Sequence, residues 1–148
     1  MKRAALIGGL ALLLLMMATA PASAASNRHL SGGGTATISQ VAFNVTIETA
    51  GGASGSFNCL MAGRSASVLS IFHLSHLMKV QAEPTAATVT GTKISFSGPG
   101  FLIMDGNAKN AIHVMVLADV ATQKFQLTVV EVGAMPVETM LTGHFELR

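Results

Sequence analysis

The stretch Gly32–Gly52, GGGTATISQVAFNVTIETAGG, contains the pattern that decides the fold. From Val41 to Ile47 an apolar side chain occupies every second position, and small or polar side chains stand between them. A period of two places the two sets on opposite faces of a β-strand. The glycine clusters Gly32–Gly34 and Gly51–Gly52 flank the pattern and mark its ends. The stretch therefore predicts a long strand with one buried face.

Similar alternating segments follow at short intervals, bounded by turn-forming residues. The expected strands are Gly55–Ala62, Ala87–Ser97, Phe101–Met104, Ala111–Asp119, Lys124–Val132 and Val137–Leu147. Val68–Val80 is ambiguous, because it fits a strand or a short helix, and its strand-like neighbours favour a strand. Gly51–Gly52 predicts a hairpin between the first two strands, and Gly98–Pro99–Gly100 predicts a break. About eight such strands predict an all-β fold, either an antiparallel β-sandwich or a closed β-barrel.

The core and the sheet edges can also be predicted from the pattern. Most of the seven phenylalanines fall on the apolar face of an expected strand, which makes them the natural core. Pairing the first long strand with the last would hide the sheet edges and slow hydrogen exchange at Val45 and Phe145 together. The phenylalanines are Phe43, Phe57, Phe72, Phe96, Phe101, Phe125 and Phe145.

The N-terminal residues have the pattern of an export signal. Basic residues at Lys2 and Arg3 precede the apolar run Ala4–Ala20, and Ala22–Ser23–Ala24 is a small-x-small cleavage site. We expect residues 1–24 to be a cleaved signal peptide and residues 25–148 to be a single all-β domain, secreted or periplasmic in a bacterium. The alternative is a retained membrane anchor, but the run is shorter than the roughly 20 residues that span a bilayer. Ala25–Ser31 reads as a flexible leader.

Signal removal leaves a chain without net charge. Of the nine basic residues, Lys2 and Arg3 leave with the signal, and the seven that remain equal the seven acidic residues in number. This balance does not support a basic patch for nucleic acid or anionic lipid. No second apolar run is long enough for a stable membrane span after signal cleavage.

Histidines are the first candidates for a metal site. His73 and His76 are three residues apart, a spacing that shares a face on a helix but not on a strand. A zinc site would need a third ligand, such as His113, His144 or Asp119. No HExxH or paired-cysteine motif is present, so we expect surface or capped histidines and no metal or cofactor.

Two other features could carry chemistry. Cys59 shares a strand face with Phe57 and Met61, which predicts a buried, inert thiol; the alternatives are a nucleophile and an intermolecular disulfide. Asp105–Gly106–Asn107 supplies oxygens as calcium loops do, but it lacks their further carboxylates and predicts a plain turn. No catalytic fingerprint occurs in the sequence, so we expect no enzyme and no catalytic residue.

Three segments together resemble small secreted bacterial all-β domains, some of which are labelled post-COAP-1. They are residues 32–63, with the G-x-F-x-C-x-M pattern at Gly55, Phe57, Cys59 and Met61, then TVTGTKISFSG at 88–98 and LTGHFELR at 141–148. In that pattern a Gly-rich start leads into a long strand, and a Thr-Gly strand closes the domain. The resemblance implies a secreted all-β module with no assigned activity, and no functional residue is implied by it.

These observations lead to three functional hypotheses. The first is a secreted, non-enzymatic β-module with a binding or structural role outside the cytoplasm. The second is a lipocalin-like carrier with one small apolar ligand inside a barrel. The third is a metal-dependent hydrolase built on the histidines. The partner would be an unknown protein or a small apolar ligand, and the apolar outer face of Ala111–Asp119 could be an interface.

Overall fold

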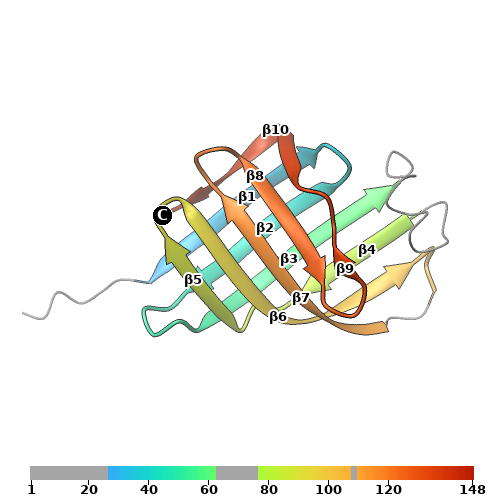
Figure 1. The fold of residues 1–148 in the computed structure, drawn as a ribbon, viewed down its shortest axis with the longest axis horizontal. Helices are drawn as coiled ribbons and strands as arrows, with labels where there is room; N and C mark the ends of the chain where they lie inside the picture. The colour runs from blue at the N-terminus through green and yellow to red at the C-terminus, as the bar shows by residue number, and fades with distance from the viewer. Residues whose placement is uncertain (1–26, 63–76, 108–109) are drawn as a thin grey trace, which may run out of the picture.

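The fold is a set of antiparallel strands, shown in a computed structural model that describes residues 27–62, 77–107 and 110–148 (Figure 1). No helix occurs in these ranges. The strands are β1 Arg28–Ala36, β2 Gln40–Ile47, β3 Ala53–Ala62, β4 Leu77–Ala82, β5 Ala86–Thr90, β6 Lys93–Met104, β7 Asn110–Asp119, β8 Lys124–Val129, β9 Gly133–Ala134 and β10 Glu138–Leu147. The expected all-β fold class is confirmed.

The paired strands form a closed ring. Their order is β10-β1-β2-β3-β4-β6-β7-β8, and β8 also pairs with β10. β4 and β5 pair with different parts of β6, β4 with its second half and β5 with its first half. The two-residue β9 pairs with β8. Closure removes the exposed edges that an open sheet of this size would have. The ring confirms the predicted antiparallel sandwich or barrel, and β2 and β3 form the predicted hairpin.

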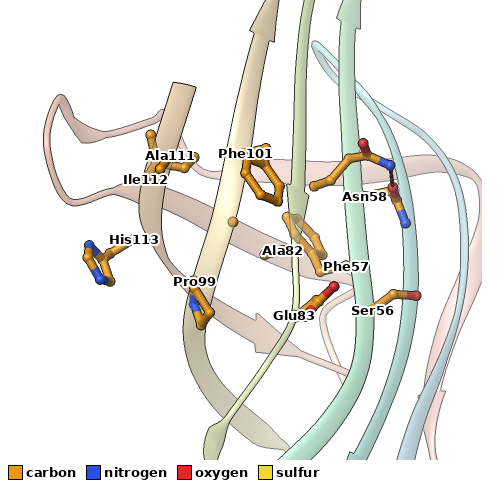
Figure 2. A pocket seen from close by; sticks show the side chains of 12 residues that line it. Ser56, Phe57, Asn58, Ala82, Glu83, Pro99, Phe101, Ala111, Ile112 and His113 are labelled. Atoms are coloured by element: carbon orange, nitrogen blue, oxygen red, sulfur yellow. Dashed lines mark hydrogen bonds between the residues drawn. The ribbon is translucent and has the colours of Figure 1, made fainter. Parts of the chain in front are cut away.

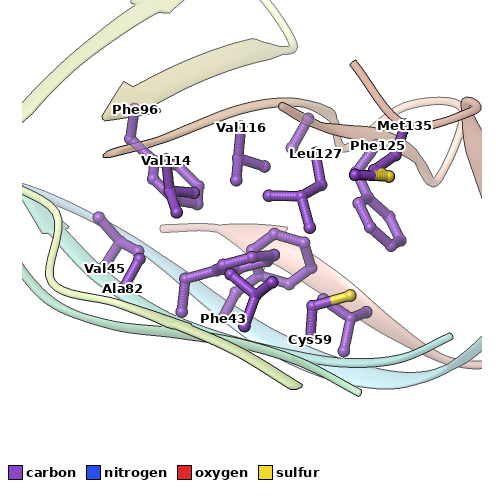
Figure 3. Packing of buried hydrophobic residues seen from close by; sticks show 14 of the residues in the cluster. Phe43, Val45, Cys59, Ala82, Phe96, Val114, Val116, Phe125, Leu127 and Met135 are labelled. Atoms are coloured by element: carbon purple, nitrogen blue, oxygen red, sulfur yellow. The ribbon is translucent and has the colours of Figure 1, made fainter. Parts of the chain in front are cut away.

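The centre of the ring is filled by phenylalanine side chains (Figure 3). The ring of Phe43 lies 4.8–6.4 Å, centroid to centroid, from four other aromatic rings, in tilted or edge-to-face arrangements. Such aromatic contacts add to the stabilisation from burial alone. The buried phenylalanines are Phe43, Phe57, Phe96, Phe125 and Phe145. The predicted core is confirmed for these five, but Phe101 is 43% exposed, and Phe72 lies outside the described residues.

The glycine cluster Gly32–Gly34 was predicted to mark the end of a strand, and this prediction is wrong. The cluster lies within β1. The expected flexible leader is also wrong from Arg28 onward, because β1 begins there. The three glycines have φ angles of 126°, 156° and 153°, which favour glycine. A Cβ on Gly33 would clash with the backbone oxygen of Val41, and one on Gly34 with that of Thr142. Glycine is therefore needed because the neighbouring strands approach closely on both sides.

The partner of the last strand also differs from the prediction. β10 pairs with β1, in the register Gly32↔Phe145, and β2 lies on the other side of β1. The predicted direct pairing of the first long strand, β2, with the last strand, β10, is therefore wrong, because the glycine-rich strand β1 lies between them. A register shift between Thr35 and Ala36 also changes the face on which the first residues of β10 lie. As a result Leu141, expected beside Phe145, is 60% exposed.

The expected strand Ala87–Ser97 is divided by a turn, and the expected break after it is absent. Gly91, with φ of 61°, turns the chain between β5 and β6. β6 then continues through Gly98–Pro99–Gly100 to Met104. A Cβ on Gly98 would clash with the backbone of Glu83, so the glycine reflects close packing of two segments. Pro99 has no N–H to donate, but its carbonyl accepts a bond from Glu83 N at 2.9 Å.

Side chains hold the joint between β8 and β10, where the two strands share only the pairs Glu138↔Phe125 and Thr139↔Lys124. Gln123 Nε2 donates to the carbonyl of Phe145 at 2.8 Å, and its Oε1 accepts from Phe145 N at 3.0 Å. The amide of Gln123 therefore replaces a backbone partner for β10. We call this joint the seam.

Two sequence predictions fall mainly outside the described residues. The signal peptide, residues 1–24, is one of them. The other is the ambiguous segment Val68–Val80, of which Leu77–Val80 belongs to β4. The structure therefore supports a strand only for the end of that segment.

Candidate functional site

A cleft of about 490 Å³ lies over β3, β4, β6 and β7 (Figure 2). It lies beside the junction at which β4 ends at Ala82 and β5 begins at Ala86, and the connecting segment stays bonded to β6 through Glu83 N and the Pro99 carbonyl at 2.9 Å. A Cβ on Gly100 would clash with the backbone of Gln81, so the two strands approach closely at this point.

The lining of the cleft combines apolar rings with amide groups. Phe101 and Pro99 contribute the apolar surface from β6. Gln81 Nε2 on β4 donates a 3.1 Å hydrogen bond to Asn58 Oδ1 on β3 (Figure 2). This bond orients two amides side by side on the wall, and Ser56 lies on the same strand as Asn58. A few placed polar groups within a mainly apolar cleft are typical of small-molecule sites.

His113 forms the β7 side of the cleft and is held in place by Glu131. The Glu131 carboxylate accepts from His113 N at 2.9 and 3.0 Å, and it lies 2.9 Å from Nδ1 of the imidazole. Contact with the His113 ring, and then with its backbone N–H, lowers the pKa of Glu131 below its ordinary value. The pair is exposed, so its main effect is to orient the imidazole.

Cys59 lies on the opposite face of β3, away from the amides. It is buried, as predicted. Burial raises the pKa of its thiol to about 12, and the nearby Ser39 only partly offsets this effect. A thiol with that pKa is protonated at neutral pH, so it is a poor nucleophile.

Of the candidate metal ligands, the described residues His113, His144 and Asp119 are not brought together. His113 lies on β7 and His144 on β10, while His73 and His76 lie outside the described residues. Asp119 accepts a bond from Ala121 N at 3.0 Å and shapes a turn. Among residues 27–62, 77–107 and 110–148, no group of three or more His, Cys, Asp or Glu side chains could hold a metal ion.

The turn at Asp105–Gly106 is present, as the sequence predicted. Asp105 has φ of 47° and Gly106 of 74°. The Asp105 carboxylate accepts a 2.7 Å bond from Leu77 N, so at least one of its oxygens serves the fold.

Sequence reasoning missed a buried carboxylate, Glu138, which is 1% exposed. It accepts hydrogen bonds from Ser39 Oγ at 2.8 and 2.9 Å and from Ile38 N at 3.1 Å. Desolvation raises the pKa of Glu138, although these bonds partly offset it. Strict alternation along the last strand would place Glu138 and Phe145 on opposite faces of the sheet. The register shift near Met140 brings both side chains to the buried face, and the sequence pattern gave no sign of this shift.

No known protein family, curated protein or solved structure significantly matches the chain. The resemblance to post-COAP-1 domains therefore stays a prediction. The described part of the chain contains no helix that is long and apolar enough to cross a membrane.

Proposed function

We propose that this protein is a non-enzymatic binding module that acts outside the cytoplasm, and that the cleft over β3, β4, β6 and β7 is its ligand site. The observation that carries the proposal is the size and lining of the cleft. Its volume of about 490 Å³ is within the range of ligand sites, about 300–1,000 Å³. The ligand would place an apolar group against Phe101 and Pro99 and hydrogen-bond to the amides of Asn58 and Gln81.

The chemistry of the lining favours binding over catalysis. Amides donate and accept hydrogen bonds but do not transfer protons at neutral pH. His113 could do so, but its ring is held by Glu131 at the border of the cleft. The protonated thiol of Cys59 lies in the core and not in the cleft. These groups suit recognition of a ligand with both apolar and amide-like surface.

A lipocalin-like carrier is the competing proposal. Its ligand would have to lie at the centre of the ring, where Phe43 contacts four other phenylalanine rings within the buried core (Figure 3). Close-packed interiors leave few spaces larger than a water molecule. The cleft on the outer side is therefore the better supported site. Export rests on the N-terminal sequence pattern, and a mature chain beginning at Ala25 would support it.

Native mass spectrometry of protein purified from its own host tests the proposal. We expect a bound organic molecule that is lost from Phe101→Ala and Asn58→Ala but kept by Leu141→Ala, an equally conservative change at an exposed residue of β10. NMR shifts on adding this molecule back should centre on Ser56, Gln81 and His113.

Other results would point elsewhere. Shifts centred on the buried residues Phe43 and Val116 would support the carrier instead, and a stoichiometric metal ion would support a metal enzyme. Retention of the molecule by both cleft variants would overturn the proposed site.

A further inference from the structure

The outward face of β7 carries two large apolar side chains that the cleft does not use. Met115 is 47% exposed and Leu117 is 48% exposed. Their neighbours in register on β6 are the small residues Ser97 and Ser95. Because serine side chains are short, Met115 and Leu117 project above their surroundings. This face was notable in the sequence because both sets of alternating residues on the strand are largely apolar.

The partners on the other side of β7 are polar, and a further apolar residue lies beyond them. Thr128 and Gln126 on β8 pair with Met115 and Leu117. Val137, 59% exposed, lines a shallow hollow together with Leu117. We call the outward residues of β6, β7 and β8, together with Val137, the β7 face. It is an apolar centre surrounded by polar groups, an arrangement found at protein interfaces.

The two ends of the β7 face carry opposite charge. At one end Asp119 lies in register between Lys93 on β6 and Lys124 on β8, so one positive charge is left over. At the other end the Glu131 carboxylate sits against His113. Six residue steps along β7 separate His113 from Asp119, so the two ends lie about 20 Å apart.

We propose that a second copy of this chain binds to the β7 face, with the two β7 strands antiparallel about a two-fold axis. A two-fold axis that lies in the interface and crosses the middle of β7 at right angles brings each end of the surface against the opposite end of its copy. Lys93 and Lys124 of one protomer then meet Glu131 of the other, and Met115 of one meets Leu117 of the other. The charge pattern fits this arrangement and opposes a parallel one, which would place like charges together.

This dimer is independent of the proposed ligand site. His113 borders both, but Phe101, Asn58 and Gln81 line the cleft and are not among the contacts proposed at the two-fold axis. The outer side of a ring of strands is convex, so we expect the contact to fall at the low end of stable interface areas. The dimer should therefore dissociate on dilution.

Sedimentation velocity of the purified protein across a wide concentration range tests the proposal. We expect a monomer–dimer equilibrium in which Met115→Asp and Leu117→Asp each raise the dissociation constant at least about tenfold. Leu141→Asp is the matched control, because it places the same charge at an exposed leucine on β10, and it should change the constant little. Circular dichroism and thermal melting establish that each variant is folded.

A charge swap tests the orientation. Glu131→Lys should weaken the dimer, and so should the double change Lys93→Glu with Lys124→Glu. All three changes together should restore much of the lost affinity, which a merely local effect of losing the His113 contact would not do. A protein that stays monomeric at every concentration would overturn the proposal, as would a dimer that survives Leu117→Asp or is equally weakened by Leu141→Asp. Triple-variant affinity no better than that of Glu131→Lys would overturn the antiparallel arrangement.

Discussion

At the scale of single residues, Phe43 is the centre of the core. It contacts Phe57, Phe96, Phe125 and Phe145, which come from four other strands. Its side chain therefore links β2 to β3, β6, β8 and β10 at one point. Sequence alternation was enough to predict its burial, but not the number of rings that meet there.

Replacing Phe43 by alanine should lower the free energy of unfolding by about 3–5 kcal/mol, because the change leaves a cavity among the other rings. Phe101→Ala is the matched control and should cost under about 1 kcal/mol, since that ring is 43% exposed. Urea denaturation followed by circular dichroism measures both. Similar losses for the two variants would show that the core is not organised around Phe43.

Glu138 makes the stability of the fold depend on pH. Its pKa lies above the ordinary value of 4.5, so the folded state binds the proton more tightly than the unfolded state. This favourable contribution is fully present below pH 4.5 and is lost as the pH rises through the raised pKa. The folded protein should therefore be destabilised by Glu138 at neutral pH relative to a neutral group of the same shape.

Glu138→Gln should consequently have a melting temperature that rises relative to the unmodified protein as the pH increases from about 4 to 8. The glutamine stays neutral, and its amide can still accept from Ile38 N and donate to Ser39 Oγ. Asp119 and Glu131, whose pKa values are lowered, titrate in both proteins and cancel in the difference. Melting curves at several pH values measure this difference in melting temperature between the two proteins. A difference that does not vary with pH would contradict the assignment.

At the scale of elements, alternation located strands well but did not recognise glycine inside them. β2, β3, β7 and β8 lie where period-two patterns predicted strands. β1 has no such pattern, because Gly32–Gly34 leave its centre without side chains, so no period can be detected. The same applies to β6, in which Gly98 and Gly100 looked like a break. Glycine in both strands reflects the close approach of neighbouring backbone, which is a property of the tertiary structure.

Gly33→Ala should therefore destabilise the protein far more than Gly91→Ala. At Gly33 the new Cβ would clash with the backbone of β2, which cannot move without disturbing the ring. A Cβ on Gly91 would meet no atom within 4 Å beyond its two chain neighbours, so the cost there is only that of the left-handed backbone, about 1–2 kcal/mol. Chemical denaturation compares the variants. Equal costs at the two positions would show that β1 does not pack as closely as the structure indicates.

At the scale of the whole molecule, the seam is the weakest joint of the ring. β6 and β7 share ten residue pairs, whereas β8 and β10 share two. Gln123 compensates by bonding both backbone groups of Phe145. Opening of the ring should therefore begin between β8 and β10, because local opening follows the regions with the fewest backbone bonds.

Gln123→Ala should increase the hydrogen-exchange rate of the Phe145 amide at least about tenfold, since that amide donates directly to Gln123. The amide of Val116, in the middle of β7, should change little. NMR-detected exchange measures both in one experiment. Equal acceleration at the two amides would indicate global destabilisation and not an opening of the seam.

The candidate site was less predictable than the fold for a related reason. The cleft is lined from four strands, and its two amides meet only after β3 and β4 pair. Neither Asn58 nor Gln81 belongs to a recognisable motif, so no local signal could have identified them. The sequence did predict that the outer face of β7 carries apolar side chains, and the structure shows these to be Met115 and Leu117.

The position of β1 between β2 and β10 has a consequence for biosynthesis. His29 exchanges two backbone hydrogen bonds with Arg148, at 2.8 and 2.9 Å. A ribosome makes these two residues more than a hundred positions apart, so β1 can pair with β2 early but has no partner on its other side until β10 has been translated. The ring can therefore close only after β10 has been made, so the nascent chain keeps open sheet edges for almost the whole of its synthesis.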